Sequence, residues 1–88
     1  MLVMDHFHRI EYRRRRPDGA LDLEQVEEVQ DHGWYIKEGE EWRRRYTLEC
    51  ACDFLRRTET KPGTFAISVW RDGARVCTVA MEWRPTKG

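Results

Sequence analysis

The stretch of residues 43–57, RRRYTLECACDFLRR, limits most strongly what this chain can fold into. Apolar residues occupy every second position within it: Tyr46, Leu48, Cys50, Cys52 and Phe54. This is the period of a half-buried strand, whereas a helix would spread the same five residues around its axis. Because the stretch contains no Pro or Gly, we expect a central strand on which the other elements pair or pack.

The length of the chain limits it to one core. A chain of 88 residues buries only roughly 60% of its unfolded surface, so we expect a single domain over residues 1–88. Hydrophobic residues make up 40% of the chain and charged residues 36%. This composition predicts a thin two-layer structure with a highly charged surface.

The N-terminal half predicts a strand, a helix and a second strand. We expect the first strand over about residues 3–14, ended by a turn at Pro17-Asp18-Gly19. A helix is expected over about residues 22–32, because Asp22 is a good N-cap and Gly33 a good stop. Residues 34–37 resume strand character, and Glu38-Gly39 is expected to turn the chain back into the central strand.

Residues 64–83 predict a β-hairpin with Asp72-Gly73 at its tip. A three-residue turn with a bulge at Gly73 would pair Ile67 with Cys77 and leave Trp70 on the outer face. A two-residue turn would instead bury Trp70 among the other apolar residues. We favour the three-residue turn, because it collects the large apolar side chains on one face.

Together these elements predict an α+β domain. One helix packs on an antiparallel sheet of about five strands, in the order strand, helix and four further strands. The sequence contains no nucleophile elbow, phosphate-binding glycine loop or metalloprotease helix motif. We therefore expect no enzymatic activity, no catalytic residue and no cofactor.

The three cysteines predict free thiols and a cytoplasmic protein, because Cys50 and Cys52 lie too close along one strand to bond each other. No segment has the length and apolarity of a signal peptide or a membrane span. An alternative is a metal-stabilised domain, in which His6 and His8 join the two cysteines if their strands are neighbours. Structural zinc sites usually place their cysteines on turns, so we expect core packing and no metal site.

Charge is distributed unevenly, although the net charge is zero on 16 basic and 16 acidic residues. The acids concentrate at residues 22–41, and we expect four of them on the outer face of the helix: Glu24, Glu27, Glu28 and Asp31. The outer face of the hairpin is expected to carry Trp70, Val76 and Thr78 with few charges. These two surfaces predict a small protein-binding module, either an inhibitor or an accessory subunit of a larger nucleic-acid-processing assembly. Self-association as a homodimer through the hairpin is a further expectation.

The alternative function is direct nucleic-acid binding. Most of the 16 basic residues are arginine, and clusters containing Arg13, Arg15, Arg43 and Arg45 offer contacts to a phosphate backbone. An exposed Trp would add a surface for base stacking. Against this, the zero net charge lacks the basic excess of a dedicated nucleic-acid binder.

Overall fold

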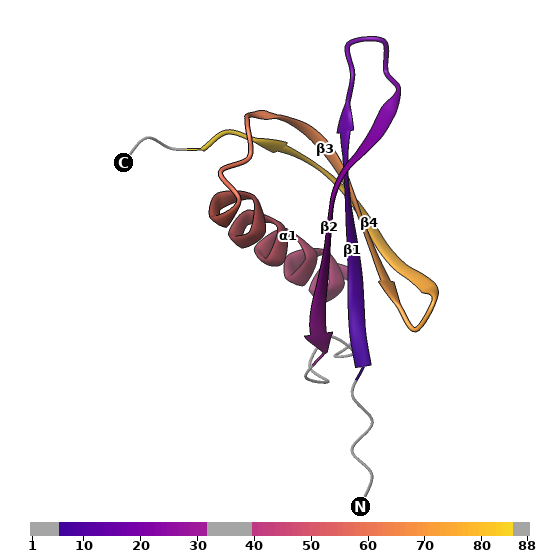
Figure 1. Cartoon of the computed structure of the whole chain (residues 1–88). Helices are drawn as coiled ribbons and strands as arrows, with labels where there is room; N and C mark the ends of the chain where they lie inside the picture. The colour runs from indigo at the N-terminus through magenta and orange to yellow at the C-terminus, as the bar shows by residue number, and fades with distance from the viewer. Residues whose placement is uncertain (1–5, 32–39, 86–88) are drawn as a thin grey trace, which may run out of the picture.

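The computed structural model describes residues 6–31 and 40–85. Their elements are β1 (His6–Arg15), β2 (Leu21–Asp31), α1 (Glu40–Arg57), β3 (Gly63–Arg71) and β4 (Ala74–Trp83). The strands form one antiparallel sheet in the order β2-β1-β3-β4, and α1 lies across one face of it (Figure 1). The predicted α+β class, one helix on an antiparallel sheet, is confirmed, with four described strands in place of about five.

The prediction of a central strand at residues 46–54 is wrong, because these residues belong to α1. Apolar residues recur along the helix at spacings of one, three and four: Trp42, Tyr46, Cys50, Ala51, Phe54 and Leu55. Ala51 and Leu55 are fully buried, while Leu48 and Cys52 are only half-buried. The alternating pattern did not include Ala51 and Leu55. These two residues are four apart and both buried, which is the spacing of one face of a helix.

The prediction of a helix at residues 22–32 is also wrong, because residues 21–31 form β2, an edge strand paired with β1. The predicted first strand is confirmed from residue 6 on, its expected start at residues 3–5 lying outside the described residues. The turn after it is also confirmed, and that turn explains the error. Gly19 has a φ of 90°, and its N–H donates to the Arg16 carbonyl over 2.9 Å, so the chain folds straight back along β1. Pairing with β1 outweighed the local helix preference. The predicted strand at 34–37 and the turn at 38–39 lie outside the described residues.

The C-terminal hairpin and its tip at Asp72-Gly73 are confirmed, but the predicted pairing is wrong. Arg71 pairs with Ala74, so the turn has two residues, and both have positive φ, 51° at Asp72 and 83° at Gly73. The register shifts inside β4 at Val76, and Ile67 pairs with Val79 instead of Cys77. A bulge within a strand reverses the faces to which the following side chains point, and the predicted bulge in the turn would have done the same. The predicted inner face, which includes Ile67, Cys77 and Val79, is therefore correct.

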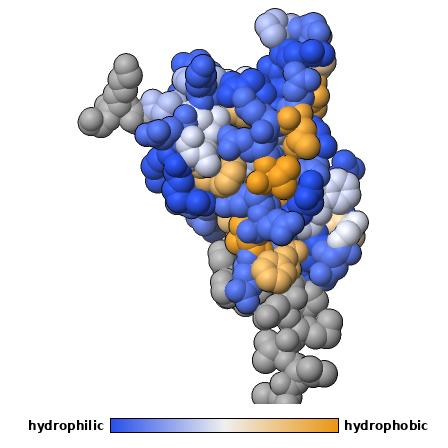
Figure 2. Space-filling view, in the orientation of Figure 1, coloured by the Kyte–Doolittle hydropathy of each residue, from blue (hydrophilic) through white to orange (hydrophobic). Residues whose placement is uncertain are grey.

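The core lies between α1 and the inner face of the sheet. Its fully or almost fully buried residues are Ile10, Tyr12, Tyr46, Ala51, Leu55, Phe65, Ile67, Val69, Val79 and Trp83. The Tyr12 and Phe54 rings stack with centroids 4.8 Å apart, and the Trp83 indole N–H donates to the Thr60 carbonyl over 3.0 Å. Figure 2 shows the side carrying α1, where the surface is mostly hydrophilic and hydrophobic residues gather near the middle. One layer of helix therefore covers part of one sheet face.

Candidate protein-binding surface

The strand β4 forms one edge of the sheet. It pairs with β3, and no other described strand pairs with it. Its residues 77–81 include no charged residue and no proline. An edge strand of this kind presents backbone N–H and C=O groups to which another strand can pair.

The opposite edge strand, β2, has a different character. Its 11 residues include several acids and no base, and its pairing with β1 shifts register between Tyr12 and Arg13. Charged side chains and bulges are features that protect a sheet edge against pairing with another chain. Strand β4 also has a bulge, at Val76, but of the two edges it is the one with an uncharged stretch, residues 77–81.

A groove of about 720 Å³ runs beside β4, and we call it the edge groove. It is lined by Glu41, Arg43 and Arg44 of α1 and by Arg75, Val76, Cys77, Thr78 and Val79 of β4. Val76 and Cys77 are half-buried and pack against the core, and Val79 is buried. Arg44 and Arg75 are exposed. The edge groove thus combines an apolar floor with a basic rim.

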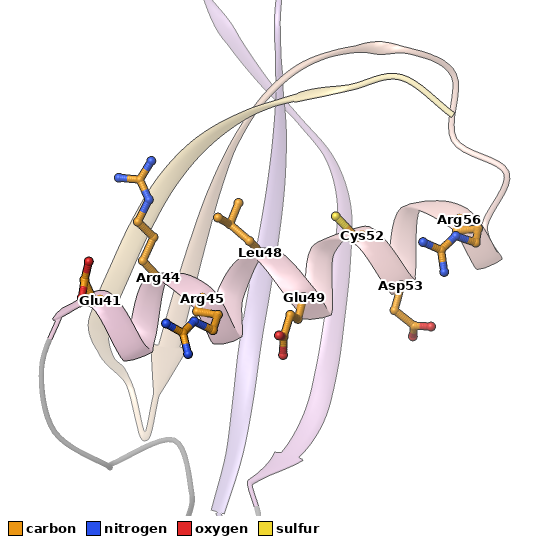
Figure 3. Close-up of a pocket in the computed structure, with 8 residues that line it drawn as sticks. All are labelled: Glu41, Arg44, Arg45, Leu48, Glu49, Cys52, Asp53 and Arg56. Atoms are coloured by element: carbon orange, nitrogen blue, oxygen red, sulfur yellow. The ribbon is translucent and has the colours of Figure 1, made fainter. Parts of the chain in front are cut away.

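A second groove, about 560 Å³, follows α1, and we call it the helix groove. Its lining residues are Glu41, Arg44, Arg45, Leu48, Glu49, Cys52, Asp53 and Arg56. Figure 3 shows Leu48 and Cys52 pointing from α1 toward the arch of β3 and β4, while Glu49 and Asp53 point away from it. Both grooves include Glu41 and Arg44, so the half-buried apolar residues of the helix adjoin the floor beside β4.

The arginines around these grooves differ from most of the described arginines elsewhere, of which Arg15 on β1 is an exception without an ion pair. Within residues 6–31 and 40–85, none of the following makes an ion pair: Arg43, Arg44, Arg45, Arg56 and Arg75. Arginines on β1 and at the end of α1 do make ion pairs: Arg9, Arg13, Arg14 and Arg57. Positive charge without a counter-charge from the described chain therefore concentrates on α1 and the start of β4.

The predicted acidic surface lies on β2, not on a helix. Two of its carboxylates are engaged within the chain: Glu24 pairs with Arg14 over 2.9 Å, and Glu27 pairs with Arg57 over 2.8 Å. Glu27 also accepts a hydrogen bond of 3.1 Å from the Tyr12 hydroxyl, whose pKa is raised by burial and by the Glu27 charge. Glu28 is exposed. The structure describes the backbone of Asp31, at the end of β2, but not its side chain.

The three predicted hairpin residues do not share one surface. Trp70 lies on the outer face of the sheet, as expected, but it is half-buried, and its indole N–H has no acceptor among the described residues. It lines a hollow of about 530 Å³ near Phe7 and Glu28. The bulge turns Val76 toward the core, which corrects its expected place on the outer face, and Val76 and Thr78 both line the edge groove.

Exposed apolar residues elsewhere form no such groove. The largest exposed fractions are those of Phe7 at 53%, Leu23 at 51%, Leu21 at 47% and Val26 at 37%. On β2 these residues lie opposite charged side chains, since Leu23 pairs with Arg13 and Val26 with Glu11. Apolar side chains interleaved with charges in this way are ordinary on protein surfaces.

The arginines proposed for nucleic acid lie on separate elements. Arg13 bonds Glu11 over 2.7 Å, and hydrogen bonds from Arg9 and Arg13 lower the pKa of that carboxyl. Arg15 is exposed at the end of β1, and Arg43 and Arg45 lie on α1. Only Arg43 and Arg45, of the four, line the grooves described above.

The metal-site alternative is not supported by the described residues. Cys50 and Cys52 are on a helix, where residues two apart project about 200° from each other. The His8 ring is buried, with its Nδ1 3.1 Å from the Tyr46 hydroxyl, and burial raises the pKa of the Cys50 thiol. Among the described residues, no group of three or more His, Cys, Asp or Glu could hold a metal ion. The same part of the chain contains no helix both long and apolar enough to cross a membrane.

Several residues of the grooves were missed by the sequence analysis, chiefly Arg44, Leu48, Cys52 and Arg75. These residues line the grooves because β4 is an edge strand and α1 lies beside it. Neither arrangement follows from local sequence. Comparison with protein-family models, curated proteins and solved structures finds no match for the chain. The geometry of these residues is therefore the basis on which a function can be inferred.

Proposed function

We propose that this protein is a small non-enzymatic protein-binding module that takes up an extended segment of a partner as an additional strand beside β4. The observation that supports this proposal is the combination of an edge strand that has an uncharged stretch, residues 77–81, with an adjoining groove that has apolar lining residues. Strand addition uses backbone hydrogen bonds for affinity and pockets for alternate side chains for specificity. Both components are available at this edge.

The position of α1 supports strand addition at β4. A strand added to the sheet would lie about 4.8 Å from β4, and every second side chain would point to the face that carries α1. Those side chains would cover the half-buried residues of the two grooves, such as Leu48, Val76 and Cys77. Removing this apolar surface from water would stabilise the complex.

The proposal is tested by capturing partners from a lysate with the native chain and with variants that carry lysine on the sheet. The variant Thr78→Lys/Ala80→Lys places charges on the β4 edge, where both native side chains are exposed. The control Thr64→Lys places a charge at an exposed position of the interior strand β3. The control should unfold at nearly the native temperature, and the β4 variant somewhat below it, because Thr78 loses its 3.1 Å hydrogen bond with Ser68.

We expect the β4 variant to lose the captured protein and the control to retain it. In the purified complex, hydrogen exchange should slow at the amides of residues 77–81, because they gain hydrogen-bond partners. Equal capture by the β4 variant, or slowed exchange along β2 instead, would contradict the proposal.

A further inference from the structure

We infer that the segment bound beside β4 is acidic, and that its carboxylates are recognised by Arg43, Arg44 and Arg75. This inference rests on the proposed function, because it names the chemistry of the strand that would be added there. It is carried by the charge and the lining of the edge groove.

Three arginines and one acid, Glu41, are the charged residues that line the edge groove. None of the three arginines makes an ion pair within the described chain, although other arginines, such as Arg14 and Arg57, bind carboxylates there. The guanidinium group matches a carboxylate with two parallel hydrogen bonds, and such charge-assisted bonds are stronger than neutral ones. A carboxylate in this groove would therefore meet donors that the chain leaves without a counter-charge.

The arrangement of these arginines fits an extended segment. Arg75 is at the start of β4, while Arg43 and Arg44 approach the same groove from α1. Side chains on one face of a strand are about 6.8 Å apart. Acidic residues at every second position would all point to the α1 side, where their aliphatic stems would cover the apolar floor and their carboxylates would reach the arginines. The backbone between them would pair with residues 77–81.

A second copy of this chain is a poor source of that segment. Its acidic strand, β2, has carboxylates that are already paired: Glu24 with Arg14, Glu27 with Arg57, and Asp22 with Arg16 over 3.3 Å. Glu28 is the one acid of β2, among those whose side chains the structure describes, without an ion pair. Strand exchange between copies would therefore match one groove arginine and would have to break existing pairs to match the others. A partner with free carboxylates meets neither difficulty.

A nucleic acid also carries anionic groups, but it matches the groove less well. The floor of the groove is apolar, formed by Val76, Cys77 and Val79, and the adjoining edge presents backbone N–H and C=O groups. A polypeptide strand can pair with those groups, whereas a phosphate backbone offers acceptors alone. The observations therefore favour an acidic peptide.

The test uses two hexapeptides with blocked termini, one alternating Glu and Val and the other alternating Gln and Val. Each is titrated into the native protein at low salt, and amide shifts of residues 77–81 are followed by NMR. We expect the Glu peptide to bind about tenfold more tightly than the Gln peptide, corresponding to three exposed ion pairs of modest strength. Added salt should reduce this difference, because it screens exposed charges.

Variants identify the arginines. Arg43→Gln/Arg75→Gln should remove most of the preference for the Glu peptide, because it weakens binding of the Glu peptide far more than binding of the Gln peptide. The control is Arg15→Gln, since Arg15 is also exposed and without an ion pair in the described chain but lies on β1. This control should keep the native preference.

Each of the other possible results contradicts either the acidic recognition, the strand addition or the identity of the bound segment. Equal binding of the two peptides would refute acidic recognition and leave strand addition standing. Absence of shifts at residues 77–81 with either peptide would refute both proposals. If an oligothymidylate displaces the Glu peptide at lower concentrations, and does so through the same arginines, the ligand of this groove is a nucleic acid and not an acidic peptide. Dimerisation without peptide, abolished by Thr78→Lys/Ala80→Lys, would make a second copy the occupant.

Discussion

Leu55→Ala and Leu48→Ala make the same chemical change at two positions of α1, and together they test its assignment as a helix. Leu55 is fully buried and Leu48 is half-buried. A strand over residues 46–54 that buried Leu48 would instead turn Leu55 to the outside. The helix assignment therefore predicts that Leu55→Ala loses more stability, and the strand assignment predicts that Leu48→Ala does.

The structure gives the expected sizes. Removing a fully buried leucine side chain costs about 3 kcal/mol, because both transfer energy and a cavity are involved. At Leu48 the loss should be about 1 kcal/mol, since part of the side chain remains in water. For a domain of this size the total stability is of the order of 4 to 13 kcal/mol. Leu55→Ala should therefore lower the melting temperature by about 15 °C and Leu48→Ala by about 5 °C.

Thermal and urea unfolding of the native protein and the two variants measure both values. Urea midpoints should fall in the same order without a change in slope, because the unfolded surface is nearly the same. A larger loss for Leu48→Ala than for Leu55→Ala would refute the assignment of residues 46–54 to a helix.

Three further predictions concern single side chains. Trp70→Phe should leave the free energy of unfolding, measured in urea, within about 1 kcal/mol of native, because it removes a buried indole N–H without a described acceptor; a loss of free energy above about 3 kcal/mol would show that this N–H has an acceptor. Glu11→Gln should lower the melting temperature at neutral pH and have no effect well below pH 4.5, because the lowered pKa of Glu11 makes its stabilisation present above that ordinary value and lost as the pH falls; an equal effect at both pH values would contradict this. Gly73→Ala should cost about 1 kcal/mol, since a φ of 83° disfavours a Cβ; unchanged stability would argue against the turn geometry.

Turn chemistry made parts of the fold predictable. Pro17-Asp18-Gly19 and Asp72-Gly73 act over a few residues, so both turns and the strands beside them could be recognised from local sequence. The apolar face of the C-terminal hairpin followed from alternation alone, although its pairing did not. A bulge at Val76 and a bulge in the turn place residues 77–83 on the same faces, so the sequence could not choose between them.

The exchange of helix and strand shows where local pattern fails. Residues 50–52 are three consecutive apolar residues, so the segment satisfies a period of two and a helical period together. Residues 21–31 contain good helix formers, but the hairpin turn places them against β1. Propensity is a weak preference, and contacts with the rest of the chain decided both segments.

From the sequence alone, the two tight turns, the strands beside them and the positions of the charges along the chain could be recognised. The class of the fold was predicted too, but with the helix and one strand exchanged. Tertiary structure decided which charges remain without counter-charges: Glu24 meets Arg14 across the first hairpin, and Glu27 meets Arg57 from α1. It also decided that β4 is an edge and that α1 lies beside it. Ion pairs and strand order depend on contacts between residues far apart in the chain, which no local period encodes. The candidate binding surface therefore became visible only in the folded molecule.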